Sequence, residues 1–190
     1  VLAHEAQVRR AAITGLGSVC SLGLDVAALW TGLSAGIQAV QRCPALAARG
    51  LDLGPLAKVT LPGEVDAVGG ALLDGSPRAT MMAQRAAAEA WQDAGLVVGR
   101  SEHLRLGICV GTTLGEKAPW VQGLRAAWGL ESGAASARHG CSAPALVLAE
   151  VYGGSRLRVV STACASGNAA LGVALQWIRR SVCDVVLCGG

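Results

Sequence analysis

The sequence predicts an α/β fold with a largely parallel sheet. Strand signals and helix signals alternate along all 190 residues, which is the pattern of strands joined by crossover helices. Apolar residues make up 52% of the chain, which has 26 glycines and no phenylalanine. We therefore expect small side chains that let helices pack closely against a sheet around one buried core.

The first half of the chain predicts one strand, one helix and one irregular region. A strand is expected over residues 8–14, closed by the turn Gly15-Leu16-Gly17. Asp25 then predicts the N-cap of a helix that ends at Gly36. The apolar residues of that helix keep helical spacing: Val26, Leu29, Trp30 and Leu33. Residues 42–75 show no convincing periodicity, so we expect a surface excursion there.

The second half predicts a regular alternation of helices and strands. Ser76 and Pro77 are typical of an N-cap and a first helical residue, and Gly95 of a stop. The expected elements are, in order, a helix over 77–94, a strand over 105–111, a helix from Pro119 to about 129, a helix over 142–152, a strand over 157–161, a helix ending at Arg180 and a strand over 184–187.

Composition argues against nucleic-acid binding and membrane insertion. The formal net charge is +3, charged residues make up 15% and aromatic residues 3%, so no basic stripe or stacking platform is predicted. The longest uncharged run, residues 159–178, is close to the ~20 residues that span a bilayer. Polar side chains and two glycines interrupt it, and residues 1–10 lack the pattern of a secretory signal. We therefore predict no membrane association and a cytoplasmic location.

The sequence predicts neither a bound cofactor nor a metal. Gly15 and Gly17 resemble the start of a dinucleotide fingerprint, but Cys20 stands where its third glycine belongs and no helix starts there. The seven cysteines are irregularly spaced without a C-x-x-C pair, so zinc and a disulfide framework lack support. Most of these cysteines lie in apolar runs, where a thiol packs as a small hydrophobe.

Cys164 stands apart from the other cysteines. The strand over 157–161 runs through Thr162 and Ala163 directly into a helix that we expect to begin at Cys164, in outline a nucleophile elbow. Backbone N–H groups at a helix start favour a thiolate and can stabilise an oxyanion. The inward stripe of that helix has four-three spacing: Cys164, Asn168, Leu171, Leu175 and Ile178. Spacing alone leaves open that Cys164 is one more packed thiol.

The sequence around Cys164 resembles that of the β-ketoacyl-acyl-carrier-protein synthases of fatty acid and polyketide synthesis. Residues 161–167 read Ser-Thr-Ala-Cys-Ala-Ser-Gly, and the chain ends in Asp-Val-Val-Leu-Cys-Gly-Gly, very nearly the active-site segment of that family. Residues 10–17, 78–96 and 105–112 agree in order and spacing, whereas the resemblance is weak over 42–75. Thiolases have a similar elbow, but their nucleophile comes much earlier than position 164.

The resemblance implies a fold and a reaction. The fold is thiolase-like, with residues 1–190 as an N-terminal α/β half-domain that has a mixed, mostly parallel five-stranded sheet. The reaction is acyl transfer followed by decarboxylative Claisen condensation, with Cys164 as the nucleophile and its own backbone N–H as one oxyanion donor. The expected partners are acyl carrier protein or coenzyme A thioesters, and a second subunit in a homodimer or a ketosynthase-like heterodimer.

Other parts of the family's machinery have no match in these residues. The two catalytic histidines, the lysine, the glutamate and the second oxyanion loop belong to a C-terminal half that we expect this chain to lack. The three histidines precede Cys164 and match no motif: His4, His103 and His139. We therefore expect the 190-residue chain alone to be inactive. The alternatives are an inactive fragment or a non-catalytic partner of the chain-length-factor type, in which the cysteine is typically replaced.

Overall fold

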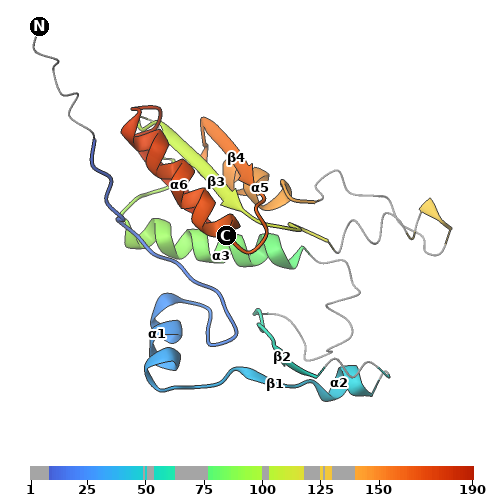
Figure 1. The fold of residues 1–190 in the computed structure, drawn as a ribbon. Coiled ribbons are helices and arrows are strands. Elements are labelled where there is room, and N and C mark those ends of the chain that lie inside the picture. The colour runs from blue at the N-terminus through green and yellow to red at the C-terminus, as the bar shows by residue number, and fades with distance from the viewer. Residues whose placement is uncertain are drawn as a thin grey trace, which may run out of the picture. The chain divides into compact units, whose positions relative to one another are not determined.

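The computed structural model describes residues 9–48, 50, 54–62, 77–99, 103–117, 125, 127–129 and 140–190. Contacts divide the chain into two compact units. The first unit is formed by Val1–Thr14, Leu96–Thr113 and Ala145–Gly190, and the second by Gly15–Gly95 and Leu114–Pro144. Figure 1 shows the order of the elements. None of the helices in the described ranges has both the length and the apolar character needed to cross a bilayer.

A three-stranded parallel sheet forms the core of the first unit. The strands are β3 (Leu106–Gly111), β4 (Arg156–Val160) and β5 (Val185–Gly189), in the order β4-β3-β5. The central strand β3 is buried at every residue, as expected for a parallel strand covered on both faces. Cys109 in β3 pairs with Arg158 in β4 and with Cys188 in β5.

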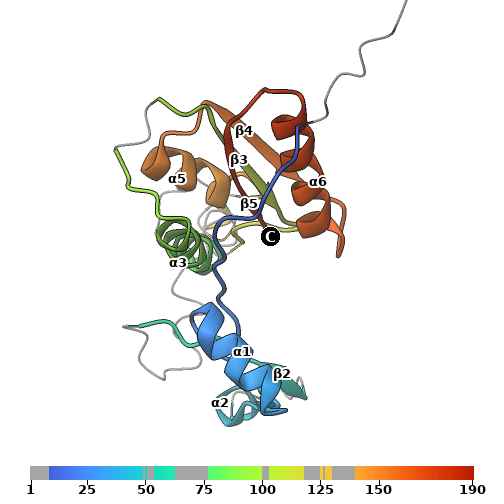
Figure 2. The same ribbon diagram turned by 90° about the vertical axis from the view of Figure 1, so that its left-hand side faces the viewer.

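Helices α5 (Ala143–Tyr152) and α6 (Ser166–Arg179) lie on opposite sides of this sheet (Figure 2). Glycine in β3 lets α6 pack closely, because a Cβ atom on Gly107 would come within 2.8 Å of the Trp177 ring and 2.9 Å of Cys183 Sγ. The best-buried apolar side chains of this unit come from the sheet, from both helices and from the turn before β5: Leu106, Ile108, Cys109, Ala145, Leu148, Ala170, Ala174 and Cys183.

An ion pair joins the amino ends of β3 and β5. Asp184 Oδ2 accepts a hydrogen bond from Arg105 Nε at 2.9 Å, Oδ1 accepts one from Nη2 at 2.7 Å, and the Ser181 carbonyl accepts one from Nη1 at 2.6 Å. The hydrogen bonds that Arg105 donates to the carboxylate hold the pKa of the Asp184 carboxyl well below its usual range. The pair fixes one end of the sheet, opposite the carboxyl ends of the strands.

In its described residues, the second unit has three helices and a small antiparallel sheet. Its elements are α1 (Val26–Ser34), β1 (Val40–Arg42), α2 (Pro44–Ala47), β2 (Pro55–Ala57) and α3 (Arg78–Asp93). Asp25 caps α1, because its Oδ1 accepts a hydrogen bond from the Ala28 N–H at 2.7 Å. This is the cap that the sequence predicts.

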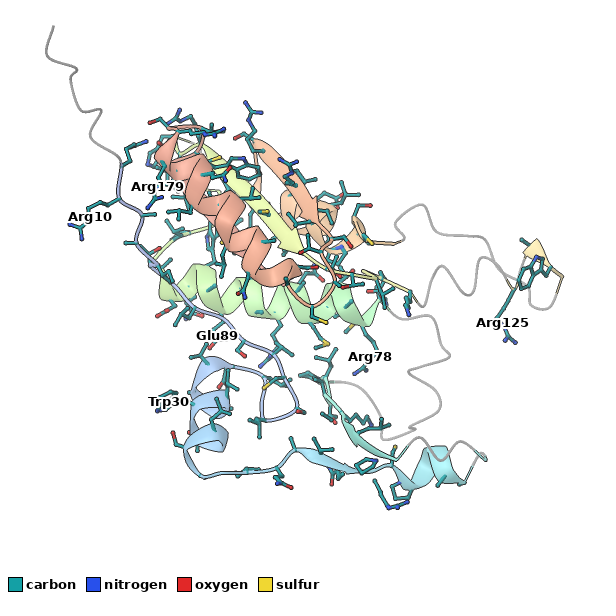
Figure 3. The ribbon with its side chains drawn as sticks, viewed as in Figure 1. Arg10, Trp30, Arg78, Glu89, Arg125 and Arg179 are labelled. Atoms are coloured by element: carbon teal, nitrogen blue, oxygen red, sulfur yellow. The ribbon has the colours of Figure 1, made fainter. Side chains whose placement is uncertain are left out.

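Glu89 in α3 fixes the segment that leads into α1 (Figure 3). Its carboxylate accepts hydrogen bonds from the Ser18 N–H at 2.9 Å and the Val26 N–H at 2.8 Å. Glycine is required in this segment, since a Cβ atom on Gly17 would lie 2.9 Å from the Ala90 nitrogen of α3. The Gly15-Leu16-Gly17 turn therefore serves backbone packing against α3.

The α/β prediction is confirmed, but the sheet differs from the expected five strands. The described residues form three parallel strands and a separate antiparallel pair. Residues 9–14 form no strand, and Ile13 is 78% exposed. The apolar pattern of this segment predicts burial that does not occur within the described residues.

The region expected as a surface excursion contains regular structure in its described part. β1 and β2 pair in the register Val40↔Ala57, and neither strand is predicted from the sequence. β1 is exposed along its length, whereas Leu61 is buried at 3% exposure. Residues 63–76, with the expected N-cap Ser76, and most of the helix expected from Pro119 lie outside the described residues. The organisation of 1–190 as one half-domain stays a prediction.

Candidate active site

Cys164 lies in a tight turn between β4 and α6. The residue before it, Ala163, has φ +52°, in the left-handed region that residues with a Cβ atom seldom adopt. Two backbone hydrogen bonds close the turn, from the Ala165 N–H to the Thr162 carbonyl and from the Ser166 N–H to the Ala163 carbonyl, both 3.2 Å. The helix begins at Ser166, two residues later than expected, because the left-handed residue delays helical geometry.

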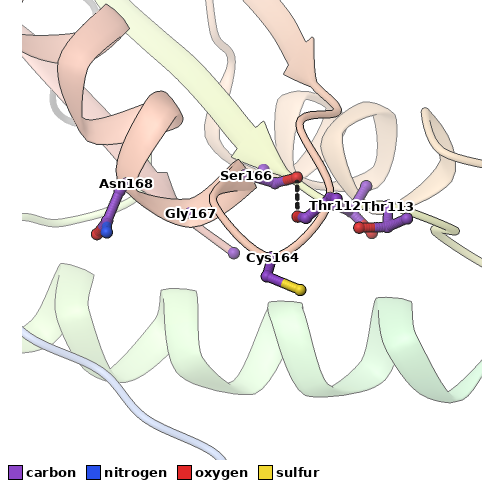
Figure 4. A pocket seen from close by; sticks show the side chains of 9 residues that line it. Thr112, Thr113, Cys164, Ser166, Gly167 and Asn168 are labelled. Carbon is purple, nitrogen blue, oxygen red and sulfur yellow. Dashed lines mark hydrogen bonds between the residues drawn. The ribbon is translucent and has the colours of Figure 1, made fainter.

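Cys164 borders a pocket of about 380 Å³. Figure 4 shows the thiol at the tip of the turn, with Asn168 on α6 to one side and Thr112 and Thr113 to the other. The pocket lies at the carboxyl ends of the strands, where parallel sheets commonly bind ligands. Its lining is Gly111, Thr112, Thr113, Ala163, Cys164, Ser166, Gly167, Asn168 and Gly190.

Glycines let three backbone segments meet behind the thiol. A Cβ atom on Gly111, at the end of β3, would meet the carbonyl of Ser166 and lie 2.7 Å from the Gly167 nitrogen. A Cβ atom on Gly190, after β5, would meet the carbonyl of Gly111. The ends of β3 and β5 therefore support the first turn of α6 through direct backbone packing.

The amino end of α6 faces the pocket with free amide groups. The first helical hydrogen bond runs from the Ala169 N–H to the Ala165 carbonyl at 2.9 Å, and Ala165, as N-cap, has no side-chain oxygen to cap the helix. No group within the described ranges accepts a hydrogen bond from the Gly167 or Asn168 N–H. Such amides and the helix dipole favour an anion, and they can stabilise an oxyanion.

The sequence predicts oxyanion stabilisation by the N–H groups at the helix start as a group, and the resemblance singles out the Cys164 N–H; neither names Gly167 and Asn168. The signal that could have found them is the alanine at position 165, since a serine, threonine or aspartate at an N-cap satisfies the amides that follow it.

The described structure separates Cys164 from the other cysteines. Cys164 is exposed, Cys109 and Cys183 are buried, and the remaining four are half-buried. Burial raises the pKa of the Cys109 thiol to about 11 and also raises the pKa values of Cys183 and Cys188. Cys109 and Cys183 are packed hydrophobes, as the sequence predicts, and all three thiols with a raised pKa are poor nucleophiles near neutral pH.

Within the described residues, no histidine lines this pocket. His103 is exposed in a turn, and His4 and His139 lie outside the described residues. Across the ranges that the structure describes, no group of three or more histidine, cysteine, aspartate or glutamate side chains could hold a metal ion.

Comparisons with known proteins show the family of the chain. The family model "Beta-ketoacyl synthase, N-terminal domain" matches residues 8–190. Nodulation protein E of Rhizobium meliloti (strain 1021) is 29% identical over 201 residues, which cover 96% of this chain and 46% of that protein. The chain therefore spans about half the length of the relatives it matches.

Two solved structures show the same fold. The ishigamide ketosynthase/chain length factor has a TM-score of 0.74 at 28% identity. The match covers 94% of this chain and 46% of the chain in that structure. A type II polyketide synthase ketosynthase, in complex with its acyl-carrier protein, has a TM-score of 0.74 at 25% identity and covers 96% of this chain, which spans 45% of that one. These likenesses confirm the predicted thiolase-like α/β fold. The chain belongs to the β-ketoacyl synthase family and matches the N-terminal domain of that family.

Proposed function

We propose that the protein forms the cysteine-bearing half of a ketosynthase that condenses an acyl group with a malonyl unit. The observation that carries this proposal is an exposed thiol, Cys164, held at a left-handed elbow on a pocket at the carboxyl ends of a parallel sheet. Among the described cysteines, Cys164 alone combines exposure with a place on this pocket.

In the first step, Cys164 takes the acyl group. Its Sγ, as thiolate, attacks the carbonyl carbon of an acyl thioester on a carrier protein or coenzyme A. The negative charge on the resulting oxyanion is stabilised by backbone N–H groups, with those of Cys164, Gly167 and Asn168 as candidate donors. When the intermediate collapses, the bond to the carrier sulfur breaks and the carrier thiolate takes up the proton that Cys164 lost. The acyl group is then a thioester of Cys164.

In the second step, a malonyl thioester on the carrier loses CO₂ and forms a carbanion. The carbanion attacks the carbonyl carbon of the acyl group on Cys164, a carbon–carbon bond forms, and the bond to Sγ breaks. The product is a β-ketoacyl thioester longer by two carbons, and the Cys164 thiolate is regenerated. Apart from Cys164, the described residues that line the pocket include no titratable side chain. Groups that assist decarboxylation therefore come from other residues or from a second subunit.

An acyl carrier protein and a second ketosynthase-like subunit are the proposed partners. One structural relative is described as a complex of an acyl-carrier protein with its ketosynthase, and another as a ketosynthase/chain length factor. Polyketide synthesis is the pathway class that these relatives favour, with fatty acid synthesis as the alternative. The proposed location is the cytoplasm.

The test is product formation by protein purified from its native source. The protein is incubated with hexanoyl-coenzyme A and malonyl-carrier protein, and the thioesters are identified by mass spectrometry. We expect a 3-oxooctanoyl product from the wild type and from the control variant Cys43→Ala, and none from Cys164→Ala. Equal product from Cys164→Ala would refute Cys164 as the nucleophile.

A second candidate is a non-catalytic subunit of the chain-length-factor type. The ketosynthase/chain length factor likeness favours it, whereas the intact cysteine elbow argues against it. Iodoacetamide separates the two candidates. A ketosynthase should be labelled at Cys164 well before its other six thiols, and a structural subunit should show uniform or absent labelling.

A further inference from the structure

We propose that Ser166 is a positioning residue for Cys164. Its hydroxyl links the residue that follows the nucleophile by two positions to the two residues that precede it, Thr162 and Ala163. Ser166 is the first residue of α6 and is buried at 4% exposure. Ser166 follows Cys164 by two residues, and the sequence does not predict that its side chain turns back toward β4. The inference rests on the proposed function, since it concerns the same thiol.

The Ser166 hydroxyl makes two hydrogen bonds to the residues before Cys164. Its Oγ accepts a hydrogen bond from the Thr162 N–H at 2.9 Å and donates one to the Ala163 carbonyl at 2.6 Å. A serine hydroxyl has one proton and can both donate and accept. Because Thr162 supplies the proton of the first bond, the proton of Ser166 is committed to Ala163. Figure 4 marks a hydrogen bond of this hydroxyl with a dashed line above the Cys164 side chain.

These bonds hold a backbone conformation that would otherwise relax. Ala163 is in the left-handed region at φ +52°, and such geometry persists only where the surroundings impose it. The two backbone bonds across the turn are both 3.2 Å, longer than either bond of the hydroxyl. Removing the hydroxyl therefore removes the two shortest links across the residue that bears the thiol.

Ser166 also connects the turn to the sheet. Its backbone carbonyl lies where a Cβ atom on Gly111 would be, so β3 packs directly against it. The hydroxyl thus ties Thr162 and Ala163 to a residue that β3 already supports. Through this connection the direction of the Cys164 side chain is set relative to the pocket.

The test measures the reactivity of Cys164 in Ser166→Ala, with Ser155→Ala as the matched control. Ser155 Oγ donates to the Leu106 carbonyl at 3.0 Å, so the control loses a similar bond at the far end of the sheet. Two rates are measured: acylation of Cys164 by hexanoyl-coenzyme A and alkylation by iodoacetamide. Urea unfolding of both variants reports stability.

We expect Ser166→Ala to slow acylation at saturating thioester by about 10- to 100-fold, the scale of a misplaced reactive group. The half-saturating concentration should stay within about twofold, because the hydroxyl is engaged with Thr162 and Ala163 and its proton is not available to the thioester. Alkylation should slow as well, Ser155→Ala should match the wild type, and Ser166→Thr, which keeps a hydroxyl, should recover most of the rate. Wild-type rates in Ser166→Ala, or an equal loss in Ser155→Ala, would overturn the inference.

The two rates separate this inference from the proposed function. If the wild type is not acylated at all, the proposed function fails, and the effect of Ser166→Ala on alkylation still decides the role of Ser166. If Ser166→Ala does not fold, hydrogen exchange of the wild type decides it. The Thr162 amide should then exchange slowly, and exchange at the rate of an unstructured peptide would overturn the inference.

Discussion

Substitution of Gly111 by alanine should disturb the nucleophile elbow from the side of the sheet. The new methyl group would meet the Ser166 carbonyl and lie 2.7 Å from the Gly167 nitrogen, well inside the 3.4 Å at which ordinary van der Waals contact begins. Overpacking costs about 1–3 kcal/mol, and we expect about 3 kcal/mol because the neighbours are backbone atoms that cannot rotate away. With a urea m-value of about 2 kcal/mol/M, the unfolding midpoint should fall by about 1.5 M.

The assay combines urea unfolding with iodoacetamide labelling of Cys164, and Gly172→Ala is the control. Gly172 lies in α6, with open space where a Cβ atom would stand, so alanine there should stabilise the protein by about 1 kcal/mol through helix propensity. Gly111→Ala should unfold earlier and should change the labelling rate of Cys164. A Gly111→Ala variant as stable as the wild type would refute the packing argument for this end of β3.

Three further predictions concern positions away from the pocket. Asp184→Asn should lower stability at pH 7, and this loss should shrink below about pH 4, where unfolded carboxylates take up protons. The sign follows from the lowered pKa of Asp184, because the ionised carboxyl stabilises the fold and the protonated carboxyl does not. Thermal unfolding of both proteins at pH 7 and pH 3 measures this difference in stability. Glu89→Ala should cost about 2 kcal/mol by freeing the two amides that Glu89 holds, as urea unfolding would show. In alkylation at pH 8 followed by peptide mapping, Cys109 should react far later than Cys164, because burial raises its pKa to about 11; equal rates would contradict its burial.

Elements set by local chemistry could be predicted from the sequence. The N-cap Asp25 is visible because a cap depends on one side chain and the helix that follows it. The strand β3 (Leu106–Gly111) is visible because a buried parallel strand is a continuous apolar run. The elbow at Cys164 could be located because a strand, a short link of small residues and a helix follow one another directly.

Elements that depend on distant partners could not be predicted. Residues 9–14 have a strand-like pattern, but pairing decides whether a strand forms, and these residues form none. β1 and β2 pair across an irregular stretch whose sequence has no alternation. The left-handed geometry of Ala163 gives no signal either, since alanine is typical of helices, and this geometry moved the helix start to Ser166.

The residues that line the pocket could be predicted from the sequence only in part. Cys164 could be found along the sequence, whereas Gly111 and Gly190 reach the site through the order of the strands. The role that we propose for Ser166 depends on a side chain that turns back across the turn, and no spacing rule indicates that direction.

The most direct test of the proposed nucleophile is to map the site of acylation. The protein is incubated with hexanoyl-coenzyme A, digested and analysed by mass spectrometry for the peptide that carries the hexanoyl group. The account predicts a hexanoyl thioester on Cys164 that hydroxylamine removes. A hexanoyl group on another cysteine, or no acylated peptide under conditions where Cys164 reacts with iodoacetamide, would contradict it.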